Sequence, residues 1–158
     1  MEFKTYAHCE GLALAHFQFT PAYRQDIFTD KVVKCEVINC FRQDAKKLGI
    51  EMVAAGFGPD HTHMYVAHWK NHAIAEMAKQ FKGHSSRVVR KKHHDRIQDK
   101  LWGKKFWTSG YFFETAGQVR DEDVEWYVAE GQAKHWENPG DFERVALVRG
   151  QMALSDYV

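Results

Sequence analysis

Residues 58–66 read GPDHTHMYV, a turn followed by the start of an alternating run. Pro59 fixes its own backbone φ and Asp60 can hydrogen-bond its own backbone, as turn residues do. The β-branched and aromatic residues that follow predict a strand. Because successive side chains of a strand point to opposite faces, His61 and His63 are expected on one face, roughly 6–7 Å apart. Two imidazoles at that separation can bind one cation. The alternative is a pair of exposed histidines in a chain that has 10 of them.

The composition is that of one folded domain. The chain has 158 residues, 44% hydrophobic and 27% charged, and we expect a single domain over 1–158 with a core over about 12–136 and a tail over 141–158. No apolar run approaches the ~18 residues of a membrane span, and the first residues do not resemble a signal peptide. The three cysteines form no CxxC pair, which favours a reducing, cytoplasmic setting without a disulfide framework. A net charge of +1 does not by itself indicate nucleic acid.

Turn residues and hydrophobic spacing predict the order of the elements. Strands are expected at residues 12–20, 50–57, 61–68 and 110–115, and helices at residues 28–48, from residue 72 onward past Phe81, and at residues 121–136. This order predicts an α+β fold of the ferredoxin-like split β-α-β type. Its sheet is mainly antiparallel with helices on one face, and a C-terminal helix carries Tyr127. The first and third strands are neighbours in that topology, so His16 is expected near His61 and His63.

A basic and aromatic segment follows Phe81. Its cations can form a solvated face, as such runs usually do. Alternatively they neutralise phosphates while aromatic rings stack on unpaired bases. The residues predicted to bind DNA on the second reading are Lys82, His84, Arg87, Arg90, Lys91, Trp102, Lys104 and Lys105.

The predicted helix at 121–136 carries further candidates for chemistry. A metal bound only by two imidazoles needs a third ligand and an open position, and Glu130 and Gln132 follow Tyr127 by about one turn. Tyr127 itself has two readings, a half-buried core residue or a nucleophile. A free tyrosine has a pKa of about 10, so the second reading requires a base or a nearby cation.

Several short motifs between His16 and Gln132 occur together in this chain. They are HFQFT at 16–20, Tyr23-Arg24, PDHTH at 59–63, FKGHSSR at 81–87, Leu101-Trp102, Phe106-Trp107, GYFF at 110–113 and VEWYV at 124–128. In this ordered set the chain resembles the single-tyrosine HUH transposases of bacterial and archaeal insertion sequences, the IS200-like family. HUH denotes two histidines flanking a hydrophobic residue.

The resemblance implies a homodimer that binds imperfect DNA hairpins at the ends of a mobile element and cleaves and rejoins single-stranded DNA. It implies that His61 and His63 hold Mg²⁺ or Mn²⁺, which positions the scissile phosphate. It also implies that Tyr127 attacks the phosphorus, forming a 5′-phosphotyrosine link and releasing a 3′-hydroxyl, without a nucleotide cofactor. In such enzymes the tyrosine helix of one subunit completes the histidine site of the other, and Gly117 is a reasonable hinge for that placement.

Two positions depart from the family pattern. Thr62 stands where an aliphatic residue is usual, a change of small expected cost. Gly131 stands where the family commonly has a metal-binding glutamine, and Gln132 is one residue further, a rotation of about 100° around a helix. We predict Gln132 as the third ligand, with Glu130 or water as alternatives. Two other functions stay open: an inactive or domesticated hairpin-binding relative, and an unrelated metal enzyme that uses His16 with His61 and His63.

Overall fold

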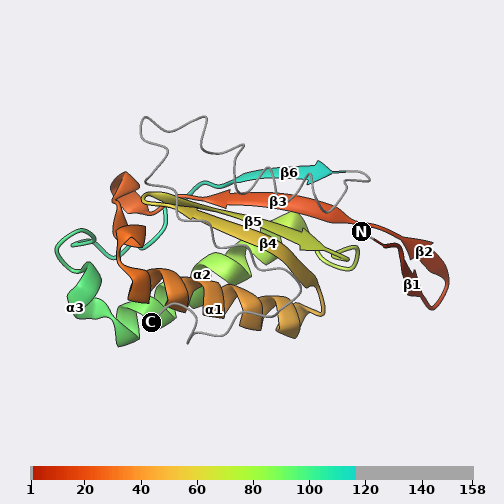
Figure 1. Cartoon of the computed structure of the whole chain (residues 1–158), viewed down its shortest axis with the longest axis horizontal. Coiled ribbons are helices and arrows are strands. Elements are labelled where there is room, and N and C mark those ends of the chain that lie inside the picture. Colours follow the sequence, from red (N-terminus) through yellow and green to blue (C-terminus); the bar gives the residue numbers. More distant parts are fainter. Residues whose placement is uncertain (1, 117–158) are drawn as a thin grey trace.

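Four antiparallel strands form the central sheet of the computed structural model, which describes residues 2–116 (Figure 1). They are β3 (Leu14–Phe19), β4 (Glu51–Gly58), β5 (His61–Ala67) and β6 (Phe112–Ala116), in the spatial order β4-β5-β3-β6. The predicted neighbours, the first and third strands, are paired as β3 and β5, and the predicted hairpin is β4 and β5. The ferredoxin-like sheet is therefore confirmed.

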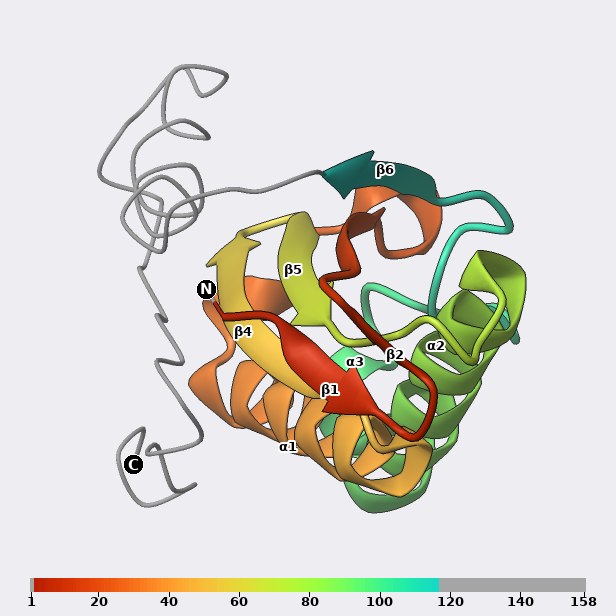
Figure 2. The same ribbon diagram turned by 90° about the vertical axis from the view of Figure 1, so that its right-hand side faces the viewer.

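Two long helices cover one face of this sheet, as Figures 1 and 2 show: α1 (Lys31–Leu48) and α2 (Ile74–Lys92). α1 begins later than the predicted residue 28, because Asp30 caps it by accepting hydrogen bonds from two backbone N–H groups of its first turn. The residues before it form a 3₁₀ turn, η2 (Ile27–Thr29). α1 ends at the predicted C-cap Gly49, whose φ of 67° is left-handed.

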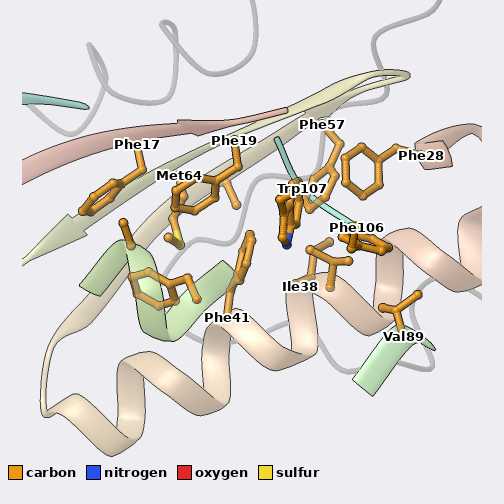
Figure 3. Close-up of a cluster of buried hydrophobic side chains, with 14 of the residues drawn as sticks. Phe17, Phe19, Phe28, Ile38, Phe41, Phe57, Met64, Val89, Phe106 and Trp107 are labelled. Carbon is orange, nitrogen blue, oxygen red and sulfur yellow. The ribbon is translucent and has the colours of Figure 1, made fainter. Parts of the chain in front are cut away.

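The hydrophobic core lies between the sheet and the helices. Figure 3 shows Phe17 and Phe19 from β3 and Met64 from β5 facing Phe41 of α1, and all four side chains are fully buried. Trp107 closes the core from the loop before β6, and its indole N–H donates a 2.9 Å hydrogen bond to a buried serine hydroxyl of α2. The period of two along each strand therefore sends one set of side chains to the core and the alternate set to the other face.

A two-stranded hairpin precedes the sheet and was not predicted. It pairs β1 (Lys4–Tyr6) with β2 (Cys9–Gly11) and lies beyond one end of the sheet (Figure 1). Most of its side chains are exposed, so its sequence lacks the alternation that a half-buried strand produces.

Part of the predicted architecture lies outside the described residues. This part includes Gly117, the helix at 121–136 with Tyr127, Glu130, Gly131 and Gln132, and the tail at 141–158. Two short elements complete the described part, a 3₁₀ turn η1 (Ala22–Arg24) and the helix α3 (His94–Ile97). Within residues 2–116, no helix has the length and apolar character needed to cross a membrane.

Candidate functional site

His61, His63 and His16 lie together on the face of the sheet opposite α1 and α2. His61 and His63 are two residues apart on β5, and their ring centroids are 4.9 Å apart with the rings perpendicular. His16 lies on the neighbouring strand β3, and its Nε2 is 2.8 Å from Nδ1 of His63. The structure thus brings together the histidines that the strand pattern predicted. All three are buried, with exposed fractions of 7%, 2% and 2% for His61, His63 and His16.

The Nδ1 atoms of His61 and His63 are both engaged by neighbouring side chains. His61 Nδ1 donates to Asp60 Oδ1 at 2.9 Å, and His63 Nδ1 is paired with His16. Histidines that bind metals commonly hold their second ring nitrogen in this way, because the bond fixes the ring's orientation and tautomer. Nε2 is then the atom through which each of these two imidazoles would bind a metal. The two imidazoles therefore offer nitrogen ligands that suit a divalent metal ion.

Burial favours the neutral form of the His16 ring. Removal from water lowers the pKa of His16 from 6.5 to about 4, so the ring is neutral at physiological pH. Its ring stacks on Tyr65 at 4.6 Å between centroids, with the planes inclined by 10°. A neutral His16 that accepts at Nε2 makes His63 the donor at Nδ1, which leaves the lone pair of His63 on Nε2. In that tautomer His16 orients His63, and its Nε2 is not available as a third ligand beside the pair.

No complete metal site lies within the described part of the chain. Among residues 2–116, no group of three or more His, Cys, Asp or Glu side chains is arranged to hold a metal ion. The predicted third ligand, Gln132, and its alternative, Glu130, lie outside those residues.

Thr62, between the two histidines, points to the opposite face and is fully buried. Its hydroxyl donates a 3.1 Å hydrogen bond to the backbone carbonyl of Gly56 on β4. A buried hydroxyl without a partner would be costly, and this bond explains why a threonine is accommodated where an aliphatic residue is usual.

Sequence reasoning missed the roles of Asp60 and Arg24. Asp60 was interpreted as a turn residue, but its carboxylate accepts from His61 and also forms a 3.3 Å ion pair with Nη2 of Arg24. The position of Asp60 directly before His61 was an available signal, because metal-binding histidines often pair with carboxylates. The contribution of Arg24 depends on the fold, which brings η1 against the β4–β5 turn.

Two of the residues predicted to bind DNA use their side chains within the protein. Lys82 Nζ donates to the backbone carbonyls of residues 108–110 at distances of 2.7–3.2 Å, and burial lowers the pKa of its ammonium. His84 Nδ1 donates to Asp44 Oδ1 at 2.8 Å across the two helices. Burial raises the pKa of Asp44, against the effect of the hydrogen bonds that it accepts from His84 and a neighbouring glutamine.

The other predicted DNA-binding residues fall into two groups. The helical group, on α2, comprises Arg87, Arg90 and Lys91, and the loop group, after α3, comprises Trp102, Lys104 and Lys105. All are exposed except the half-buried Arg90, whose pKa is lowered by burial. The helical group belongs to the layer on the far side of the sheet from His61 and His63 (Figure 2). The helical group therefore does not form one continuous surface with the histidines.

Comparison with known proteins gives one family and one curated relative. A family model described as "Transposase IS200 like" matches residues 11–131. The ISDra2 transposase TnpA of Deinococcus radiodurans is 24% identical over 113 residues, which is 72% of this chain and 79% of that protein.

Two solved structures resemble this fold. A Deinococcus radiodurans protein described as a transposase superposes with a TM-score of 0.63 at 23% identity, covering 81% of this chain and 95% of that one. A REP-associated tyrosine transposase, bound to a REP hairpin, superposes with a TM-score of 0.57 at 13% identity, covering 98% and 89%. At these identities the likeness to the two structures concerns the fold.

Proposed function

The chain belongs to the IS200-like transposase family, and from that premise we propose that it cleaves and rejoins single-stranded DNA at hairpin-bearing ends of a mobile element. The observation that carries the proposal is the pair His61 and His63, adjacent on β5 with each Nδ1 held by a partner. A hairpin substrate is supported by the tyrosine transposase of similar fold whose structure contains a REP hairpin.

In the proposed reaction His61 and His63 would hold Mg²⁺ or Mn²⁺ through Nε2, with Gln132 as the third protein ligand. Such an ion polarises a phosphoryl oxygen and so favours attack at phosphorus. Asp60 and His16 keep the two imidazoles in the orientation that binding requires. The hydrogen bonds of this chain would thereby hold the two imidazoles in place before the substrate binds.

Tyr127 is the proposed nucleophile. Its oxygen forms a bond to phosphorus while the bond from phosphorus to the 3′ oxygen breaks. The products are a 5′-phosphotyrosine link and a free 3′ end, with the phenolic proton lost and a proton gained by the 3′ oxygen. The ester conserves the energy of the broken bond, so attack by another 3′-hydroxyl can rejoin DNA without a nucleotide cofactor.

The test is the covalent adduct between the protein and single-stranded element ends in the presence of Mn²⁺. We expect Tyr127→Phe to abolish the adduct while hairpin binding persists. Tyr111→Phe is the matched control, since it also deletes one phenolic hydroxyl, at a residue that is 37% exposed, and it should retain the adduct. An adduct that survives Tyr127→Phe would remove this residue from the mechanism.

The same assay separates the alternative function, a hairpin-binding relative that does not cut. Gly131, at the position of the usual ligand, is the observation that favours this alternative. Wild-type protein that shifts hairpin DNA and gives no adduct would establish it.

We also propose a homodimer in which the tyrosine helix of one subunit completes the histidine site of the other. Mixing and re-equilibrating the inactive variants His61→Ala and Tyr127→Phe tests this arrangement. Assembly between subunits leaves one intact site per mixed dimer and restores the adduct. Assembly within each subunit leaves every site defective and restores none.

A further inference from the structure

Tyr23 and Trp102 form a stacked aromatic pair at the protein surface. Their ring centroids are 5.1 Å apart and their planes are inclined by only 6°. They are the most exposed of the large hydrophobic side chains in the described part of the chain, at 62% and 68%. Single exposed aromatic residues are common on protein surfaces. A stacked pair forms a continuous apolar surface, and such surfaces often mark binding sites.

The backbone that carries Tyr23 is strained. Tyr23 and Arg24 have φ values of 59° and 50°, and two consecutive non-glycine residues in this left-handed region are unfavourable. The turn is held by the Ala22 N–H, which donates a 2.8 Å hydrogen bond to the Phe106 carbonyl. The surrounding fold thus maintains a conformation that places Tyr23 against Trp102, and such maintained strain is typical of functional positions.

This pair adjoins the histidine site through a short chain of contacts. Arg24, the residue after Tyr23, forms the 3.3 Å ion pair with Asp60, and Asp60 accepts the 2.9 Å bond from His61 Nδ1. The aromatic pair is therefore linked to the proposed phosphate site by two side-chain contacts.

The charge around the pair favours a polyanion. Lys104 and Lys105 are exposed just after Trp102. The Arg24 side chain is 72% exposed, and its ion pair with Asp60 reduces its net charge. The nearby Lys100 is paired with Asp26 at 2.6 Å, so it contributes less net charge. Exposed aromatic faces interleaved with cations match single-stranded nucleic acid, in which unpaired bases stack and phosphates are neutralised.

We propose that Tyr23 and Trp102 form a stacking platform for an unpaired base of the single-stranded DNA that flanks the cleavage site. One ring face of Trp102 lies on Tyr23, and the exposed remainder of the indole receives the base. The proposal rests on the proposed function and adds to it the surface that holds the unpaired strand.

The experiment compares two probes of equal backbone charge, without metal so that no cleavage occurs. One is a thymidine oligonucleotide of about 16 residues, within the length that such surfaces bind. The other is an abasic oligonucleotide of the same length. Fluorescence anisotropy with the full chain should show tighter binding of the thymidine probe, and Trp102→Ala should weaken that binding by about 10-fold while leaving the abasic probe unaffected. Trp102→Phe keeps an aromatic face and should retain most of the preference.

Phe3→Ala is the matched control. Phe3 is another exposed aromatic residue, at 56%, and it precedes β1. Trp102 follows α3, and Figure 1 shows β1 and α3 at opposite ends of the molecule. This variant should bind both probes as the wild type does. If Trp102→Ala weakens both probes equally, or weakens neither, the platform is overturned. If the wild type binds neither probe, the platform is overturned, and the adduct assay on hairpin-bearing ends still tests the proposed function separately.

Discussion

The two faces of the sheet are built from alternate residues of the same strands, and their chemistry is opposite. On the helical face, Phe19 of β3 packs against Phe41 and Trp107 without a polar partner. On the other face, His16 of β3 and His63 of β5 are joined by a hydrogen bond between their rings. The period of two thereby separates the residues that stabilise the fold from those proposed to perform the reaction.

Because of this separation, substitutions at two adjacent residues of a strand should affect different properties, stability for one and metal binding for the other. Met64 is a core residue and His63 a site residue, although they are neighbours in the chain. If the separation is real, substitutions on the helical face should reduce the free energy of unfolding, and substitutions on the histidine face should chiefly reduce metal binding.

The largest effect is expected from Phe19→Ala. Phe19 is fully buried among aromatic rings, so its truncation should lower the free energy of unfolding by about 3–5 kcal/mol through lost burial and a cavity. Urea unfolding followed by circular dichroism measures this. Gln18→Ala on the same strand, facing the other way, is the control and should cost about 1 kcal/mol or less. Equal losses for the two variants would contradict the separation of the faces.

The reverse pattern is expected from His61→Ala. Asp60 keeps its ion pair with Arg24 in this variant, so the fold should be little affected. Mn²⁺ affinity should fall by more than about 100-fold, because losing even a residue that supports a ligand costs 10–100-fold. Titration followed by electron paramagnetic resonance measures it. Thr62→Val is the control, since it should cost about 1 kcal/mol of stability through the lost bond to Gly56 and leave Mn²⁺ binding unchanged. Unaltered Mn²⁺ binding by His61→Ala would exclude His61 as a ligand.

The strands and long helices were predictable because each buries one face, which imposes a period on the sequence. His16 could be placed near His61 and His63 from topology alone. The β1–β2 hairpin could not be predicted, since Lys4, Thr5 and Cys9 are exposed and leave no such period.

Pairings between residues far apart in the chain could not be predicted from the sequence either. Nothing local indicates that Arg24 binds Asp60, that Tyr23 stacks on Trp102, or that Lys82 binds the carbonyls of the loop before β6. These contacts depend on how the fold places η1, the β4–β5 turn and that loop against one another. The sequence therefore predicts candidate ligands better than it predicts the residues that orient them.

A smaller effect is expected from His16→Phe, which tests whether the histidine face depends on orientation. Phenylalanine can keep the stack on Tyr65 but cannot accept a hydrogen bond from His63. Mn²⁺ affinity should fall by about 10–100-fold with little change in stability. His16→Gln offers an oxygen acceptor and should recover part of the affinity. If His16→Gln and His16→Phe bind Mn²⁺ equally, the hydrogen bond does not orient His63.

The smallest effect is expected on the helical side, from Asp30 at the start of α1. Burial acts to raise the pKa of Asp30, but hydrogen bonds from Arg96 and from the N–H groups of Val33 and Val32 outweigh it, and the net pKa is lowered. A carboxyl whose folded-state pKa is lowered stabilises the protein above its ordinary value of 3.8, and that contribution is lost as the pH falls through the folded-state pKa.

Asp30→Asn keeps a good helix cap and removes only the charge that faces Arg96. At neutral pH it should therefore cost about 1 kcal/mol or less, since the ion pair is partly exposed. Thermal unfolding measured at descending pH should show the wild type and the variant converging below pH 3.8. A constant difference at all pH values would mean that the cap geometry, and not the charge, is what Asp30 contributes. Mn²⁺ binding at neutral pH should be the same in both proteins, because Asp30 belongs to the helical layer and has no contact with the histidine face.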